Sequence, residues 1–193
     1  SFDNAKLFYE YFLCENSKAS VVVVHGLSEF TKKYYEVAAY FLNQGYNVFL
    51  FDLRCHGLSQ RLTEDIELIH VDAFKDYADD LEQFIDKIVI PAEEKPVYIY
   101  SHSMGGGISA MYLEKNSEKI KKAVLSSPMI EPYAGKTPVF LARFFMWVEN
   151  TFMDPAAKWN FSSEFNPEYS FKNSSDSSEA RFNHNLNMRI NNA

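Results

Sequence analysis

A serine lies at the junction between a predicted strand and a predicted helix, at Ser103. The apolar, β-prone run Val97–Tyr100 precedes this serine, and Gly105 and Gly106 follow it where a helix can begin. The run Ser101-His-Ser-Met-Gly105 is close to Gly-x-Ser-x-Gly, a pattern that holds a serine in a strained turn above the edge of a sheet. The neighbours must be small because strand and helix approach closely, and Ser101 is small enough although the pattern prefers glycine. We therefore interpret Ser103 as a candidate nucleophile for acyl transfer.

A second element suited to this chemistry is the loop that begins at His25 and Gly26, directly after the apolar run Val21–Val24. In acyl transfer the tetrahedral intermediate carries an oxygen anion, which needs N–H donors that are already in place. The backbone N–H groups of Leu27 and Met104 occupy the positions from which such donors come. An ordinary strand-to-helix loop is the alternative interpretation, and the serine downstream favours an oxyanion hole.

A general base for Ser103 is not evident among the remaining histidines. His56 follows a predicted strand, and we interpret it as structural and hydrogen-bonded within its own loop. His102 occupies the variable position of the serine pattern, so its side chain is expected to point away from the reacting oxygen. His70 precedes a predicted helix, and His184 lies in a polar segment near the C-terminus.

Strands and helices alternate along the first 126 residues, and this order implies an α/β protein whose mostly parallel sheet carries helices on both faces. The run Val21–Val24 is wholly apolar and β-branched, as is typical of a strand buried on both faces. Ligands of parallel sheets bind at the carboxyl ends of the strands. We therefore expect His25, Asp52 and Ser103, which all follow strands, to meet at one crevice. The expected strands are Lys6–Leu13, Val21–Val24, Tyr46–Phe51, Val97–Tyr100 and Ile120–Leu125, and the expected helices are Thr31–Asn43, Asp72–Val89 and Met104–Lys115.

The composition is that of an ordinary globular protein, because 47% of the 193 residues are hydrophobic and 23% are charged. The formal net charge of −7, without a visible basic stripe, argues against nucleic-acid binding. Cys14 and Cys55 have neither metal-ligand spacing nor a disulfide framework, so we expect no metal and a reducing, cytoplasmic compartment. No apolar run reaches the roughly 18 residues of a membrane span, and no signal-peptide layout is visible. Any membrane contact is therefore expected to be peripheral.

The character of the sequence changes after Pro128. We divide the chain into residues 1–128, the N-terminal part of the core, and residues 129–193, a cap or lid region. Pro138–Phe152 is an apolar, aromatic helix candidate that would line or cover an acyl site. Residues 161–193 are rich in Asn and Ser, and they form either a poorly ordered tail or part of a cap over the crevice.

Three segments resemble the monoglyceride lipase and lysophospholipase group of α/β-hydrolases, which is the serine aminopeptidase S33 or hydrolase 4 group. The resemblance covers roughly residues 5–130, although Cys55 stands where the group usually has glycine. The run Ser177-Ser-Glu-Ala-Arg-Phe-Asn-His-Asn-Leu186 also resembles the cap segment of bacterial lysophospholipases. The three segments are His25-Gly-Leu-Ser-Glu29, Tyr46-Asn-Val-Phe-Leu-Phe-Asp-Leu-Arg-Cys-His-Gly-Leu-Ser59 and His102-Ser-Met-Gly-Gly106.

The resemblance implies the α/β-hydrolase fold, with Ser103 at its nucleophile elbow and the backbone N–H groups of Leu27 and Met104 as the oxyanion hole. It implies no cofactor and no metal. It also implies an aspartate and a histidine on strands after the cap, in the chain order Ser, Asp, His. Asp154 and Asp176 come too early, and no histidine of this chain occupies the last position. We therefore expect the chain to stop before the Asp and His of the triad, to lack the C-terminal part of the sheet, and to be inactive alone.

The resemblance further implies a serine carboxylic-ester hydrolase that acts on a monoacyl lipid, either a lysophospholipid or a monoglyceride, through an acyl-enzyme on Ser103. Its partner is then a small lipid ester and not a nucleic acid. Two alternatives remain open. A proline-type aminopeptidase has the same fold and would use an acidic cap residue, Glu131 or Glu149, to hold a free amino terminus. A non-catalytic binding module that has lost the triad would keep the elbow alone.

Overall fold

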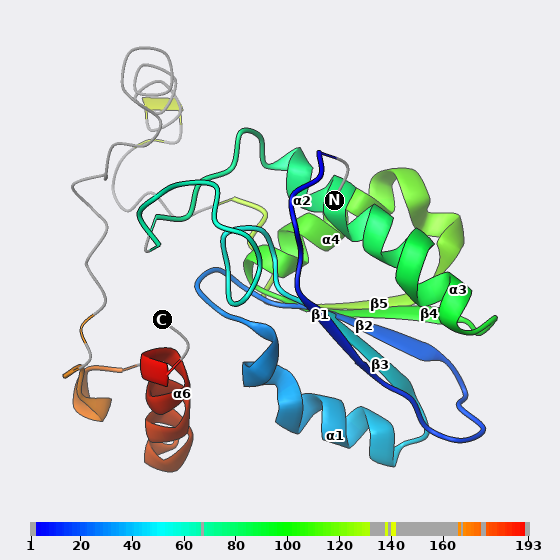
Figure 1. Ribbon diagram of the computed structural model, residues 1–193, viewed down its shortest axis with the longest axis horizontal. Coiled ribbons are helices and arrows are strands. Elements are labelled where there is room, and N and C mark those ends of the chain that lie inside the picture. The colour runs from blue at the N-terminus through cyan, green and yellow to red at the C-terminus, as the bar shows by residue number, and fades with distance from the viewer. Residues whose placement is uncertain are drawn as a thin grey trace.

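The computed structural model describes residues 3–66, 68–131, 168–174 and 177–191, together with residues 138, 140, 141 and 166. The strands are β1 (Tyr9–Phe12), β2 (Ser20–Val24), β3 (Asn47–Phe51), β4 (Val97–His102) and β5 (Ile120–Ser126). They form one sheet in the order β1-β3-β2-β4-β5 (Figure 1). β1 pairs with β3 antiparallel, and all other neighbours run parallel. This arrangement confirms the predicted mostly parallel α/β sheet, and it places the first strand at an edge.

Helices cover both faces of the sheet, as the alternating sequence predicts. The 3₁₀ turn η1 (Thr31–Tyr34) and α1 (Tyr35–Asn43) lie on one face, and α2 (Lys75–Phe84) and α4 (Met104–Asn116) pack together on the other (Figure 1). The predicted helix start at Asp72 is wrong, because α2 begins at Lys75 and the Asp76 carboxylate accepts the N–H of Ala73 at 3.1 Å. The π-helical η2 (Ile85–Val89) and α3 (Ile90–Ala92) follow α2, and the 3₁₀ turn η3 (Ser117–Lys119) follows α4.

Buried apolar side chains form one cluster on each face of the sheet. Val22 and Val24 belong to the cluster that packs against α2 and α4, and Val21 and Val23 belong to the cluster that packs against α1. This alternation follows from the two-residue period of a strand. Every residue of β2 is buried, which confirms the prediction of a strand covered on both sides. The loop that leaves the carboxyl end of β2 therefore starts from a firmly held position.

The sheet is open at β5 within the described part of the chain. Among the described strands, β5 pairs with β4 alone, and the Val124 side chain on it is 57% exposed. None of the described helices combines the length and the apolarity that crossing a lipid bilayer requires.

The polar C-terminal segment contains ordered structure. It holds the short turn η4 (Phe171–Asn173) and the helix α6 (Glu179–Asn191), which lies beside η1 (Figure 1). Arg181 Nη2 is 2.8 Å from Glu36 Oε1, an ion pair that joins α6 to α1. Most of the helix predicted at 138–152 lies outside the described residues. The division into a core and a cap at residue 129 stays a prediction.

Candidate active site

Ser103 sits in a strained backbone conformation between β4 and α4. Its φ is +51° and its ψ is −118°, a region that costs a non-glycine residue about 1–3 kcal/mol. Hydrogen bonds on both sides hold the turn: the Ser103 N–H donates to Ser126 O at 3.0 Å, and Ser103 O accepts from the N–H of Met129 at 2.8 Å. The structure thus contains the sharp strand-to-helix turn that the serine pattern predicts.

Glycines allow the neighbouring backbone to approach this turn. A Cβ placed on Gly105 would lie 2.4 Å from Val24 O and 2.5 Å from His25 O. A Cβ placed on Gly26 would lie 3.2 Å from Ser103 Cβ, so the loop after β2 lies directly against the serine. The expected need for small residues is therefore confirmed, and its cause is contact with the end of β2.

Replacing Gly105 with alanine is expected to destabilise the protein by about 3 kcal/mol, at the upper end of the usual range for an overfilled core. The added methyl group meets two backbone carbonyls, which cannot rotate away as a side chain can. Urea denaturation of the natural protein measures the change. Lys115→Ala, on the exposed end of the same helix, is the control and should stay within about 0.5 kcal/mol. An unchanged midpoint for Gly105→Ala would contradict the packing described here.

His25 is a fully buried structural residue of the loop. Its Nε2 accepts the N–H of Leu53 at 3.0 Å, which leaves the proton on Nδ1, where it can be donated to Gly26 O at 2.8 Å. Burial, with a smaller effect of His56, lowers the pKa of His25 to about 3. Both ring nitrogens are thus engaged in a neutral ring that ties β2 to the loop after β3.

His56 is also structural, which confirms the interpretation made from the sequence. The ring is buried, and its Nδ1 lies 2.9 Å from Arg54 O within the same loop. Burial lowers the pKa of His56 to about 4. The ring packs against His25 with 5.2 Å between the ring centroids, so this contact joins the loops that follow β2 and β3.

Asp52 does not join the serine, contrary to the expected meeting of three strand ends. Its carboxylate accepts the N–H groups of Thr31 at 2.6 Å and Leu58 at 2.8 Å, and burial raises its pKa. Gly57 turns tightly over it, because its φ is +48° and an added Cβ would lie 2.1 Å from Asp52 Oδ2. Asp52 therefore connects the loop after β3 to the start of η1 as a structural group.

Of the two predicted oxyanion donors, Met104 directly follows the serine in the chain, and Leu27 lies in the loop that packs against the serine. Met104 is the first residue of α4, and an N–H in the first turn of a helix has no acceptor within that helix. Leu27 directly follows Gly26, and its side chain is 50% exposed. Within the part of the chain that the structure describes, no three His, Cys, Asp or Glu side chains gather as a metal site.

Glu29 is a site residue that the sequence interpretation missed. Its Oε2 accepts the N–H of Gly26 at 2.8 Å and the hydroxyl of Tyr34 at 2.6 Å, and its Oε1 is 2.5 Å from Lys33 Nζ. Burial acts to raise the pKa of Glu29, but the hydrogen bonds from Lys33 and Tyr34 hold it below its ordinary value. The carboxylate thus shapes the loop that carries Leu27. An acid three residues after the glycine was the signal available in the sequence.

Glu29→Ala is expected to destabilise the protein by about 1–3 kcal/mol, because the buried N–H of Gly26 loses its acceptor. Glu29→Gln keeps an oxygen acceptor and should cost less than the alanine variant. Thermal or urea unfolding of the natural protein provides the measurement, with the exposed helix residue Glu114→Ala as a control of near-zero effect. Equal stability of Glu29→Ala and Glu114→Ala would refute this role.

A mostly parallel sheet whose fourth strand ends in a strained serine turn, packed against the loop after the second strand, defines an α/β-hydrolase. The chain belongs to the family described as serine aminopeptidase, S33, whose model matches residues 15–187.

Curated relatives include two lysophospholipases. The chain is 37% identical to the probable lysophospholipase L2 of Haemophilus influenzae over 127 residues, which make up 65% of this chain and 40% of that protein. It is 34% identical to lysophospholipase L2 of Escherichia coli over 148 residues, or 76% of this chain and 43% of that protein. It is 29% identical to the monoglyceride lipase of Saccharomyces cerevisiae over 143 residues, again 43% of that protein. The chain therefore spans less than half the length of these relatives.

Solved structures share the fold. A monoacylglycerol lipase of Paleococcus ferrophilus matches with a TM-score of 0.59 and 23% identity, over 75% of this chain and 51% of that chain. A soluble variant of the Saccharomyces cerevisiae monoglyceride lipase matches with a TM-score of 0.60 and 22% identity, over 78% of this chain and 51% of that chain.

Proposed function

We propose that the natural protein is a serine carboxylic-ester hydrolase that acts on a monoacyl lipid, either a lysophospholipid or a monoglyceride. The observation that carries this proposal is the strained turn at Ser103, held against the glycine loop after β2. The substrate class is supported by the relatives, which are named lysophospholipases and a monoglyceride lipase.

In the proposed reaction the Ser103 hydroxyl oxygen attacks the ester carbonyl while a general base takes its proton. The N–H groups of Leu27 and Met104 stabilise the oxygen anion that forms. The ester C–O bond then breaks, the alcohol leaves with the proton, and water hydrolyses the acyl-enzyme to a free fatty acid. His25 and His56 are unsuited as the base, because burial lowers their pKa values to about 3 and about 4, so both rings resist protonation. In addition, His25 Nε2 already accepts the N–H of Leu53. We assign the base to a histidine of the natural protein outside these 193 residues.

The test is hydrolysis by the natural protein of a lysophospholipid and of a monoglyceride with the same acyl chain, combined with fluorophosphonate labelling. Release of fatty acid with labelling at Ser103 is the expected result. Well-folded protein that neither labels nor releases fatty acid would overturn the proposal and favour a non-catalytic binding module.

A second candidate is a serine aminopeptidase, which the description of the matching family favours. The exposed residue Glu131 lies two residues after Met129, whose N–H bonds to Ser103 O, so this acid is near the elbow in the chain. Cleavage of a peptide with an N-terminal proline, with little release of fatty acid from the lipids, would support the aminopeptidase over the lipid hydrolase. Loss of that cleavage in Glu131→Gln would support capture of the amino terminus by the carboxylate.

The 193-residue chain on its own is expected to show no more than trace esterase activity, because loss of the histidine of such a triad costs about a millionfold in turnover. Release of p-nitrophenol from a short p-nitrophenyl ester measures this, with the Ser103→Ala chain as the background. Robust hydrolysis that depends on Ser103 would show that this chain contains its own base.

A further inference from the structure

We propose that the pocket between α6 and the η1–α1 segment binds the phosphate group of a glycerophospho ligand. This inference rests on the proposed function and deepens it. The proposed function leaves two lipid classes open, and they differ in this group, because a lysophospholipid carries a phosphate and a monoglyceride does not. A phosphate site would therefore direct the protein towards lysophospholipids.

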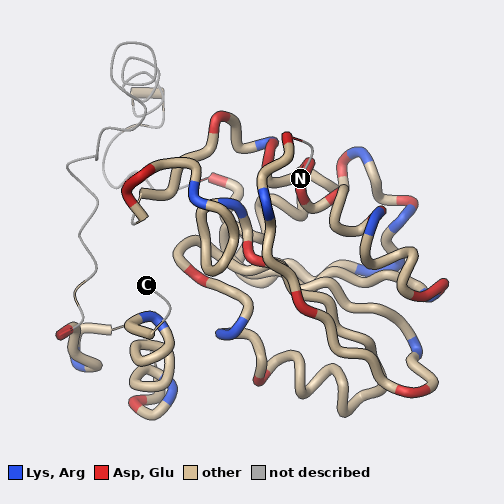
Figure 2. The backbone as a smooth tube through the Cα atoms, viewed as in Figure 1, with Lys and Arg blue, Asp and Glu red and all other residues tan. Residues whose placement is uncertain are grey.

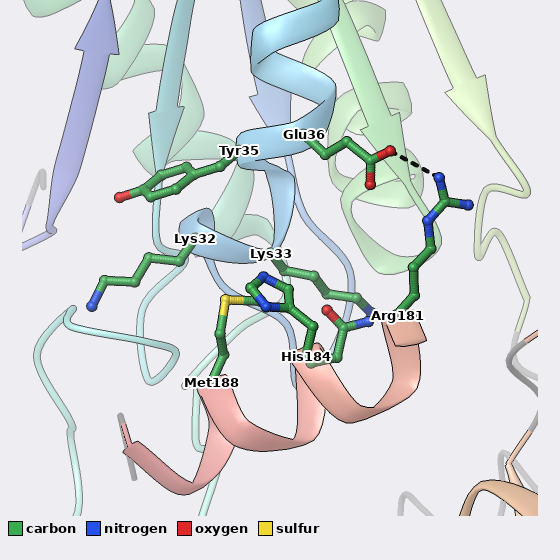
Figure 3. Close-up of a pocket in the computed structure, with 8 residues that line it drawn as sticks. Lys32, Lys33, Tyr35, Glu36, Arg181, His184 and Met188 are labelled. Atoms are coloured by element: carbon green, nitrogen blue, oxygen red, sulfur yellow. Dashed lines mark hydrogen bonds and ion pairs between the residues drawn. The ribbon is translucent and has the colours of Figure 1, made fainter. Parts of the chain in front are cut away.

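The pocket has a volume of about 270 Å³ and is formed by segments far apart in the sequence. From α6, Arg181, His184 and Met188 point towards η1 and α1 (Figure 3). From the opposite side, the Lys33 and Glu36 side chains extend towards α6 (Figure 3). The space is sufficient for a phosphate group with part of the glycerol attached.

Positively charged side chains outnumber negatively charged ones in the lining of this pocket. Lys32, Lys33 and Arg181 are positively charged, His184 adds an imidazole N–H, and Glu36 is the single carboxylate among the described residues that line it. Lys and Arg positions occur on both η1 and α6 (Figure 2). This local excess of positive charge contrasts with the formal net charge of −7 for the chain. Charge-assisted hydrogen bonds from arginine and lysine are the interactions by which proteins hold phosphate.

The Glu36 carboxylate orients the Arg181 guanidinium and leaves other N–H donors of that group able to bind a ligand. Glu36 Oε1 accepts from Arg181 Nη2 at 2.8 Å, and the hydrogen bonds from Arg181 and Tyr40 lower the pKa of Glu36, which keeps it ionised. A guanidinium has five N–H donors, so Arg181 can hold Glu36 and a phosphate oxygen together. The Lys33 ammonium has three donors, of which its 2.5 Å contact with Glu29 needs one.

The position of α6 places this pocket next to the loop that flanks the candidate nucleophile. Arg189 Nη2 on α6 lies 3.5 Å from Ser28 O, adjacent to Leu27. The same loop contacts Ser103 through Gly26. In a lysophospholipid only the glycerol separates the ester from the phosphate. A phosphate site that serves a substrate attacked at Ser103 must therefore lie close to this loop.

The binding experiment uses the Ser103→Ala form of the natural protein, which removes turnover, and follows backbone amide signals by NMR. The probes are inorganic phosphate, glycerol 3-phosphocholine and glycerol. The two phosphate probes should give saturable shifts confined to η1, α1 and α6, and glycerol should not. A triple variant, Lys32→Gln with Arg181→Gln and His184→Gln, should weaken phosphate binding by about tenfold or more, as expected for several partly exposed charge contacts. Lys33 stays unchanged because it supports Glu29.

Kinetics distinguish a lipid headgroup from free phosphate as the natural ligand. In the active natural protein the triple variant should raise KM for a lysophospholipid and leave KM for the matched monoglyceride unchanged. If phosphate binds but both substrates respond equally, the pocket takes free phosphate and its role as a headgroup site is wrong. Lys87→Gln, at an exposed lysine on η2, removes one positive charge away from the pocket and is the control.

Two results would overturn the phosphate site itself. These are the absence of saturable shifts with either phosphate probe, and equal weakening by Lys87→Gln and the triple variant. The proposed function fails by a different result, the absence of fatty acid release from both lipids. Phosphate binding is measured on the inactive variant, so the two failures can be told apart.

Discussion

Replacing Ser103 with alanine in the natural protein is expected to lower kcat for its ester substrate by roughly a millionfold, as in other serine hydrolases that lose their nucleophile. Labelling by a fluorophosphonate should disappear at the same time. The reason is geometric: the turn with φ of +51° presents this serine at the end of β4, beside the loop after β2. No other hydroxyl occupies that turn.

Ser101→Ala is the matched control for this prediction. Ser101 lies two residues earlier on β4 and is fully buried, with its hydroxyl 3.5 Å from Val124 O. Its alanine variant should keep full labelling. If labelling persists in Ser103→Ala and is lost in Ser101→Ala, the nucleophile is Ser101 and the assignment to Ser103 is wrong. The fold of both variants is checked by circular dichroism.

Breaking the buried ion pair between Arg54 and Asp80 is expected to have the largest effect on stability. Arg54 Nε and Nη2 donate to the two carboxylate oxygens of Asp80 at 2.7 and 2.8 Å, and both side chains are at most 1% exposed. Asp3 Oδ2 accepts from Arg54 Nη1 at 2.9 Å. Asp80→Asn removes the negative charge of the bidentate partner from a buried guanidinium. It should destabilise the protein by about 3–5 kcal/mol.

Urea denaturation measures this loss, and two further variants establish its cause. Asp86→Asn breaks the more exposed pair with Lys119, whose atoms are 2.8 Å apart, and should cost less than about 1 kcal/mol. Arg54→Met combined with Asp80→Leu removes both charges and should recover much of the stability lost in Asp80→Asn. If the double variant is less stable than Asp80→Asn, unpaired charge is not the cause of the loss.

The order of the elements could be predicted from local patterns. The apolar run of β2, the β-prone run before Ser103 and the glycines after it depend on neighbours in the chain, and the structure contains all of them. The antiparallel direction of β1 was not evident, because a single strand contains no information about its partner. The helix starts at Lys75 rather than Asp72, and the Ala73 N–H before it donates to the Asp76 carboxylate, a contact that the sequence interpretation did not anticipate.

By itself, the sequence determined the sheet, the serine turn and its glycine neighbours, because steric limits on a strand-to-helix turn act over a few residues. The tertiary structure decided which polar groups serve the site and which serve the scaffold. It showed that Asp52 holds two loops together, that Glu29 holds the loop beside Ser103, and that α6 forms a cationic pocket against η1. No local sequence pattern specifies the partners in these contacts, because the partners meet only when the chain folds.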